Sequence, residues 1–139
     1  MIYLDTSALV KLVRIEPESE NLIGWLDERV ETPWITSVLA EIELPRAIRA
    51  VAPQGLPAVP GVLARLDRFE IDAVIRSTAA AYPDEGLRSL DAIHLATAQV
   101  ASTVSRLTAL VAYDGRLRHA AAALGLPVAA PGAATIDQC

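Results

Sequence analysis

Short apolar runs alternate with helical segments along almost the whole sequence, and this alternation constrains the fold more than any other feature. The runs with the pattern of buried strands are residues 2–4, 34–36, 69–71, 107–113 and 127–131. The helical segments between them are residues 7–14, 19–31, 38–51, 62–67, 72–82, 89–102 and 116–124. Strands that alternate with helices form a parallel sheet covered on both faces. The sequence therefore predicts a three-layer α/β/α fold, with a turn-rich break at residues 53–61.

The length of 139 residues suits a single domain, residues 1–139. Hydrophobic residues make up 53% of the chain, which excludes a disordered protein. We find no apolar stretch near the ~20 residues that span a bilayer, and no signal-peptide pattern. Cys139 is the only cysteine, so no internal disulfide can form. This cysteine usage is compatible with the reducing cytoplasm, where we expect the protein.

The net charge of −5 argues against a broadly cationic protein that coats nucleic acid regardless of sequence. The basic residues are nearly all arginines, and Lys11 is the only lysine. Because the planar guanidinium group pairs well with phosphate, a local nucleic-acid groove stays open as an interpretation. Lys11, Arg14, Arg46, Arg49, Arg116 and Arg118 are candidates to guide a phosphate backbone, and a solvated surface role is the alternative for each.

Four carboxylates occupy unusual places in this pattern. Asp5 ends the first apolar run, and Asp114 follows the fourth. Glu41 interrupts an apolar stripe in the helix after the second run, and Asp91 opens the apolar helix LDAIHLATA. Ligands of open α/β sheets bind beyond the carboxyl ends of the strands. We therefore expect all four carboxylates at one end of the sheet.

Each carboxylate also has a purely structural explanation. Asp5 and Asp114 each precede a helix and can cap it, and Asp91 can interact with the helix dipole. Glu41 is harder to explain, because a glutamate on an apolar stripe is rarely buried without a partner. Two carboxylates ~4 Å apart repel by about 4 kcal/mol at an effective dielectric constant of about 20. A cluster would therefore take up protons or bind a hard cation, Mg²⁺ or Mn²⁺, that can activate water against a phosphodiester.

The chain resembles PIN-domain proteins, and in particular the VapC-type toxin ribonucleases of bacterial toxin–antitoxin pairs. The segments that carry the resemblance are YLDTSALVKL, ITSVLAEIELPRAI, LRSLDAIHLATA and LVAYDGRLRHAAAALGLPV, in the order of the family. The resemblance implies about five parallel strands, Mg²⁺ or Mn²⁺ as cofactor, RNA as substrate, a homodimer, and an antitoxin that blocks the site. It implies catalytic and metal-binding roles for Asp5, Glu41, Asp91 and Asp114.

One departure from the family pattern is Ala112, which stands where a serine or threonine is common two residues before the last aspartate. Thr6 and Ser7 could donate to the cluster instead, or simply cap a helix. His94 shares a helix face with Asp91, three residues earlier, and either orients a ligand or packs in the core.

Rival functions fit the residues less well. A haloacid-dehalogenase-type phosphatase needs a second aspartate where this chain has Ser7, and a response-regulator receiver needs a late lysine. A non-catalytic binding module is expected to have lost at least one of the four carboxylates. We therefore predict a metal-dependent endoribonuclease. The mean hydropathy of +0.35 also favours a dimer and a groove for an antitoxin between the helices at 19–31 and 38–51.

Overall fold

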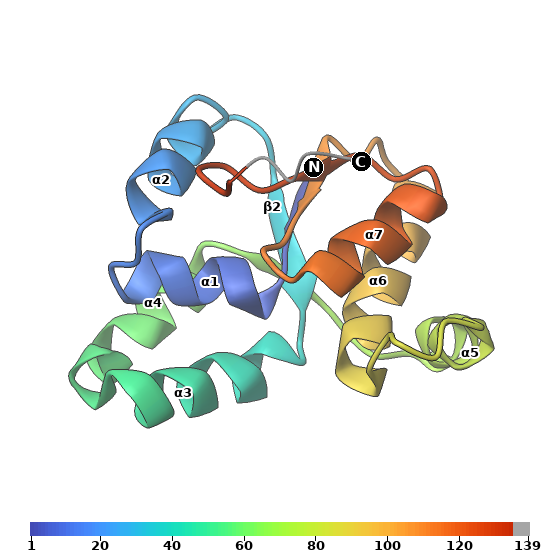
Figure 1. The fold of residues 1–139 in the computed structure, drawn as a ribbon, viewed down its shortest axis with the longest axis horizontal. Helices are drawn as coiled ribbons and strands as arrows, with labels where there is room; N and C mark the ends of the chain where they lie inside the picture. The colour runs from blue at the N-terminus through green and yellow to red at the C-terminus, as the bar shows by residue number, and fades with distance from the viewer. Residues whose placement is uncertain (135–139) are drawn as a thin grey trace.

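A parallel sheet of five strands lies at the centre of the computed structural model, which describes residues 1–134 (Figure 1). The strands are β1 (Ile2–Leu4), β2 (Trp34–Ser37), β3 (Asp67–Phe69), β4 (Ala109–Val111) and β5 (Val128–Ala129). Their order across the sheet is β3-β2-β1-β4-β5, and every pair of neighbours is parallel. The predicted fold class is confirmed.

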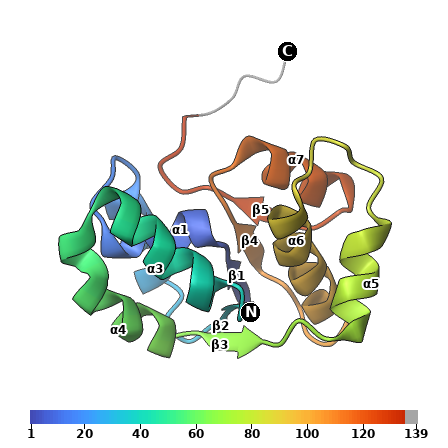
Figure 2. The ribbon, with the colours of Figure 1, turned by 90° about the horizontal axis from the view of Figure 1, so that it is seen from below.

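Helices cover both faces of the sheet, as Figure 2 shows. On one side lie α1 (Thr6–Val13), α2 (Ser19–Asp27), α3 (Ala40–Val51) and α4 (Val59–Ala64), and on the other lie α5 (Ala73–Ala81), α6 (Ser89–Ser102) and α7 (Gly115–Ala123). The alternation of side chains along β1 divides the core accordingly. Ile2 and Leu4 pack among α1–α4, while Tyr3 packs against α6 and α7.

The turn-rich break at residues 53–61 contains a 3₁₀ helix, η1 (Pro53–Ala58), which leads directly into α4. Proline has no N–H to donate and clashes with the preceding helical turn, so the prolines of this segment suit a short 3₁₀ helix better than an α-helix. Gly55 lies close to the core here: a β-carbon at this position would approach Val13 Cγ1 to 3.2 Å.

Several predicted boundaries were wrong, among them those of the helix expected at residues 62–67, which is α4 (Val59–Ala64). Two further differences have clear physical reasons. β3 begins at Asp67 rather than at residue 69, because the first two residues of this edge strand are exposed and carry no apolar signal. The second helix ends at Asp27 rather than at residue 31, and Val30, which seemed to continue its apolar stripe, is exposed.

The strand order reverses between β1 and β4, which are neighbours at the middle of the sheet. This switch point places the carboxyl ends of both strands beside one another. Among the residues described, no helix is long and apolar enough to cross a membrane. Cys139 lies outside the described residues.

Candidate active site

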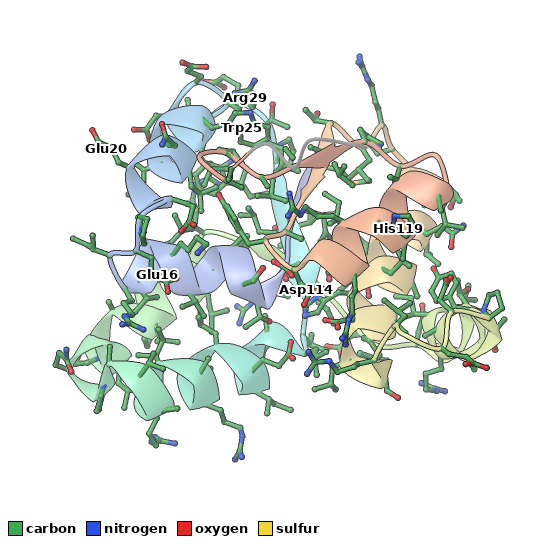
Figure 3. The ribbon with its side chains drawn as sticks, in the orientation of Figure 1. Glu16, Glu20, Trp25, Arg29, Asp114 and His119 are labelled. Atoms are coloured by element: carbon green, nitrogen blue, oxygen red, sulfur yellow. The ribbon has the colours of Figure 1, made fainter. Side chains whose placement is uncertain are left out.

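A polar cavity of about 350 Å³ lies at the carboxyl ends of β1 and β4. Four carboxylates line it, from Asp5, Glu43, Asp91 and Asp114. The other lining residues are Thr6, Ser7, Arg88, Ser89, Leu90 and His94. Figure 3 shows Asp114 just ahead of α7 and close to the beginning of α1. The fold thus brings together the starts of α1, α6 and α7 with one turn of α3.

Asp5 caps α1 and also faces the cavity. Its Oδ1 accepts hydrogen bonds from the Ala8 N–H at 3.0 Å and from the Ser7 hydroxyl at 2.6 Å. Only 4% of the residue is exposed. Burial raises the pKa of Asp5, although the hydrogen bonds from Ser7 and Ala8 oppose that rise. Capping is therefore observed, and it leaves Oδ2 for a second role.

Asp114 repeats this arrangement at α7. Its Oδ1 accepts from the N–H groups of Arg116 at 2.9 Å and Leu117 at 3.0 Å. Asp91 lies in the first turn of α6. Its pKa is raised by burial and by the negative charge of Asp114. These two carboxylates are therefore close enough to repel, as the sequence predicts for a cluster.

Glu41 does not line the cavity, and its expected placement was wrong. Its carboxylate is exposed and forms an ion pair with Arg68 at 3.3 Å. Glu43, two residues later, occupies the place expected for Glu41 and accepts hydrogen bonds at Oε1 from Thr6 at 2.7 Å and from His94 at 2.7 Å. Partial burial works to raise the pKa of Glu43, but the hydrogen bonds from His94 and Thr6 outweigh burial, so its pKa is lowered.

The error came from the choice of helical stripe. The apolar stripe that Glu41 interrupts in the sequence includes Ile42, but Ile42 is 62% exposed. The buried residues of this helix are Ala40, Leu44 and Ile48, at a spacing of four. A stripe drawn through Leu44 and Ile48 would have placed Glu43 at the edge of the buried face, one turn after Ala40.

The comparisons with known proteins agree with this fold. The family model for the PIN domain matches residues 2–123. The chain belongs to the PIN domain family. This PIN domain is 74% identical over 134 residues to Ribonuclease VapC35 of Mycobacterium tuberculosis, covering 96% of this chain and 99% of the relative. Ribonuclease VapC46 of the same organism is 42% identical over 130 residues, covering 94% and 97%.

A solved structure shares the fold of this PIN domain. The crystal structure of FitAcB from Neisseria gonorrhoeae matches with a TM-score of 0.65 and 21% sequence identity, over 92% of this chain and 96% of that chain. At this level of identity the match supports the architecture alone.

Ser7 supplies a hydroxyl beside Asp5 in this PIN domain, whereas Ala112 has none. The Ser7 hydroxyl donates to Asp5 Oδ1 at 2.6 Å and accepts from the Tyr113 N–H at 3.0 Å. It therefore ties the segment after β4 to Asp5, across the two central strands. This bond network orients Asp5 relative to the chain that leads to Asp114.

The basic residue that lines the cavity is not one of the six candidates named from the sequence. Arg88 is the arginine that lines the cavity, and its charge counteracts the rise in the pKa of Asp91. Arg116 lines a neighbouring cavity of about 480 Å³ together with His119. Lys11 is instead engaged in ion pairs with Glu16 and Glu18.

The donor chemistry of the PIN-domain cavity suits a hard divalent cation. All four acidic groups offer carboxylate oxygens, which Mg²⁺ and Mn²⁺ prefer. The hydrogen bonds found within residues 1–134 for Asp5 and Asp114 engage Oδ1, so Oδ2 of each is left for a cation or water. Over the same residues, no three acidic, histidine or cysteine side chains converge into a ready-made ligand set. Mutual repulsion is the physical reason to expect such carboxylates to stay apart without a cation.

Proposed function

We propose that this PIN domain is a divalent-metal-dependent endoribonuclease. The observation that carries the proposal is the gathering of four carboxylates around one polar cavity at the switch point of the sheet. The similarity to proteins named ribonucleases, at 74% and 42% identity, supports RNA as the substrate. A site with four carboxylates would repel an anionic substrate unless a bound cation neutralised their charge.

Asp5, Glu43, Asp91 and Asp114 are the residues that would hold Mg²⁺ or Mn²⁺. The bound cation would supply an activated water and neutralise charge that develops on the phosphodiester. The protein groups prepare the site: Ser7 and Ala8 fix Asp5, while the first N–H groups of α7 fix Asp114. Arg88 is the cationic side chain at the cavity and is suited to bind a phosphate of the RNA backbone.

We further propose that the protein is the toxin of a toxin–antitoxin pair, acts in the cytoplasm and forms a homodimer. Several large apolar side chains are exposed, among them Ile42, Val74 and Leu90, and they support association. An apolar cavity of about 420 Å³ between α1, β2 and α4, lined by Trp34 and Val62, is a better candidate for an antitoxin than the groove expected between α2 and α3. Sedimentation of the purified protein at micromolar concentration tests the dimer.

A non-catalytic PIN module is the competing interpretation. Such a module has no reason to keep a full set of acidic side chains around one cavity. Here Asp5 pays a burial cost that a neutral asparagine, which caps a helix equally well, would avoid. The retention of the buried carboxylate therefore favours catalysis.

Incubation of purified protein with structured RNAs in Mg²⁺, Mn²⁺ or EDTA tests the function. We expect cleavage with either cation and none in EDTA. An Asp91→Asn protein, prepared in parallel, should be inactive and so excludes a contaminating nuclease. Cleavage that persists in EDTA and in the Asp91→Asn protein would contradict the metal mechanism.

A further inference from the structure

A chain of hydrogen bonds runs from the core of the protein to the cavity. The Tyr3 hydroxyl lies 2.6 Å from Nδ1 of His94, and Nε2 of His94 lies 2.7 Å from Oε1 of Glu43. Tyr3 is fully buried and His94 is 2% exposed. The two rings pack edge to face, with centroids 5.8 Å apart. Two hydrogen bonds in series thus join a tyrosine, a histidine and a carboxylate from three different elements.

The chemistry of the three groups fixes the protons along this chain. An ionised Glu43 can only accept, so Nε2 of His94 must carry a proton. In the Nε2–H tautomer, Nδ1 is an acceptor for the Tyr3 O–H, which lies 2.6 Å away. Burial raises the pKa of Tyr3, so its hydroxyl keeps its proton. Thr6 lies 3.2 Å from the same Nε2 but donates its own proton to Glu43, so the shorter Nε2–Glu43 contact dominates.

We propose that Tyr3 and His94 are positioning residues for Glu43: Tyr3 holds His94 in its Nε2–H tautomer, and His94 presents that N–H to Oε1 of Glu43. This inference rests on the proposed function, since it gives Glu43 its orientation toward a cation. The hydrogen bonds from His94 and Thr6 both end on Oε1. Oε2 of Glu43 therefore remains to face the cavity.

Rigid attachment matters for this glutamate more than for the aspartates. Asp5 and Asp114 have short side chains that are fixed by the N–H groups of the helices they precede. Glu43 lies inside α3 and has an additional methylene group, so its carboxylate can swing away from the cavity. Groups that orient a metal-binding side chain typically change metal affinity or activity by about 10–100-fold when they are removed. Tyr3 does not contact Glu43 itself and acts on it through its hydrogen bond to His94.

Nitrogen NMR of the imidazole rings in metal-free protein tests the tautomer directly. The chain has two histidines, and the exposed His119 on α7 serves as the reference (Figure 3). A His119→Gln protein assigns the signals. We expect His94 to be protonated at Nε2 with Nδ1 in a hydrogen bond, whereas His119 should average both tautomers. A His94 ring protonated at Nδ1 alone, or at both nitrogens, overturns the proposal, whether or not the protein cleaves RNA.

Variants then test whether Tyr3 and His94 position Glu43. Tyr3→Phe keeps the ring and removes the hydroxyl, and we expect the Kd for Mn²⁺ to rise by about tenfold. Tyr82→Phe is the matched control, because it removes a hydroxyl that donates to Gln99 at 2.6 Å, away from the cavity. Its Kd for Mn²⁺ should equal that of the parent. In Tyr3→Phe, the Nδ1 resonance of His94 should move toward that of a nitrogen without a hydrogen bond.

A double substitution separates positioning from general loss of packing. Because Tyr3 acts through His94, Tyr3→Phe should add little to the loss of Mn²⁺ affinity caused by His94→Gln. Additive losses, or a Tyr3→Phe protein that binds Mn²⁺ like Tyr82→Phe, overturn the proposal. If Tyr3→Phe does not fold, the spectrum of the parent still decides the tautomer. A parent protein that binds no Mn²⁺ refutes the proposed metal chemistry. The spectrum of the metal-free protein tests the His94 tautomer independently of that result.

Discussion

Asp5 combines two roles that conflict energetically at the scale of a single residue. As a cap it stabilises α1, while as a buried carboxylate it resists ionisation. Asparagine retains the capping oxygen and carries no charge. If capping were the only role of this residue, asparagine would serve as well as aspartate or better.

We predict that Asp5→Asn lowers RNA cleavage by at least about 100-fold and leaves the melting temperature in EDTA unchanged or raised, because the buried charge is removed while the cap is kept. Cleavage assays and thermal unfolding measure the two effects. Asp72→Asn is the matched control, since Asp72 caps α5 in the same way, through the Ile75 N–H at 2.9 Å, and does not line the cavity. Equal cleavage by Asp5→Asn and the parent would show that Asp5 is only a cap.

Glu41 and Glu43 offer a second comparison within one helix. Glu43→Gln removes the charge at the cavity, so we predict at least a tenfold rise in the Kd for Mn²⁺, on the order of the loss known for groups around metal sites. Glu41→Gln breaks only the exposed pair with Arg68, which is worth at most about 1 kcal/mol. Manganese titration and cleavage assays distinguish the two. The reverse ranking would restore Glu41 to the site.

At the scale of elements, the site is built from helix beginnings. α1 and α7 both start at an aspartate that accepts from its own helix, and Asp91 lies in the first turn of α6. The positive ends of these helices offset part of the negative charge that gathers at the cavity. α3 contributes differently, because Glu43 lies inside its first turn and does not cap the helix.

The glycines of the α1–α4 side allow a test of packing between elements. We predict that Gly24→Ala, within α2, stabilises the protein by about 0.5–1 kcal/mol, because no heavy atom lies within 4 Å of the new methyl group. Gly55→Ala should destabilise it by about 1–3 kcal/mol, because its methyl group would come within 3.4 Å of Ile48 Cγ2 as well as crowding Val13. Urea denaturation gives both values, and a neutral Gly55→Ala would indicate that η1 packs less tightly than observed.

At the scale of the whole molecule, cation binding and folding are linked. A cation that binds only the folded protein stabilises it, by about 2.7 kcal/mol at a concentration of 100 times Kd. We therefore predict that Mg²⁺ and Mn²⁺ raise the melting temperature of the parent by several degrees, and that Asp91→Asn loses this response. Thermal unfolding with and without each cation makes the measurement.

The net charge of −5 requires a control for this prediction, because salt also screens repulsion among surface charges. NaCl at matched ionic strength supplies it. An equal rise in melting temperature with NaCl, or in the Asp91→Asn protein with Mn²⁺, would mean that screening accounts for the effect and that no specific site is filled.

The layers of the fold and much of the site can be predicted from the sequence. The apolar runs and helical segments are local patterns, and parallel pairing follows from their alternation. It also placed Asp5, Asp91 and Asp114 at one end of the sheet, because a residue after a strand or in the first turn of a helix has a position set by its own element. The structure agrees on all three placements.

The choice between Glu41 and Glu43, and the hydrogen bonds that join Tyr3 and His94 to Glu43, depend on packing between distant segments. Which side of α3 is buried depends on how the helix packs, and two apolar stripes compete in its sequence. Tyr3 and His94 are 91 positions apart and meet only because β1 and α6 pack against each other. Local sequence patterns do not predict such long-range contacts. The partner of a buried polar group is chosen by the packing of elements, which the chain acquires when the sheet and its helices assemble.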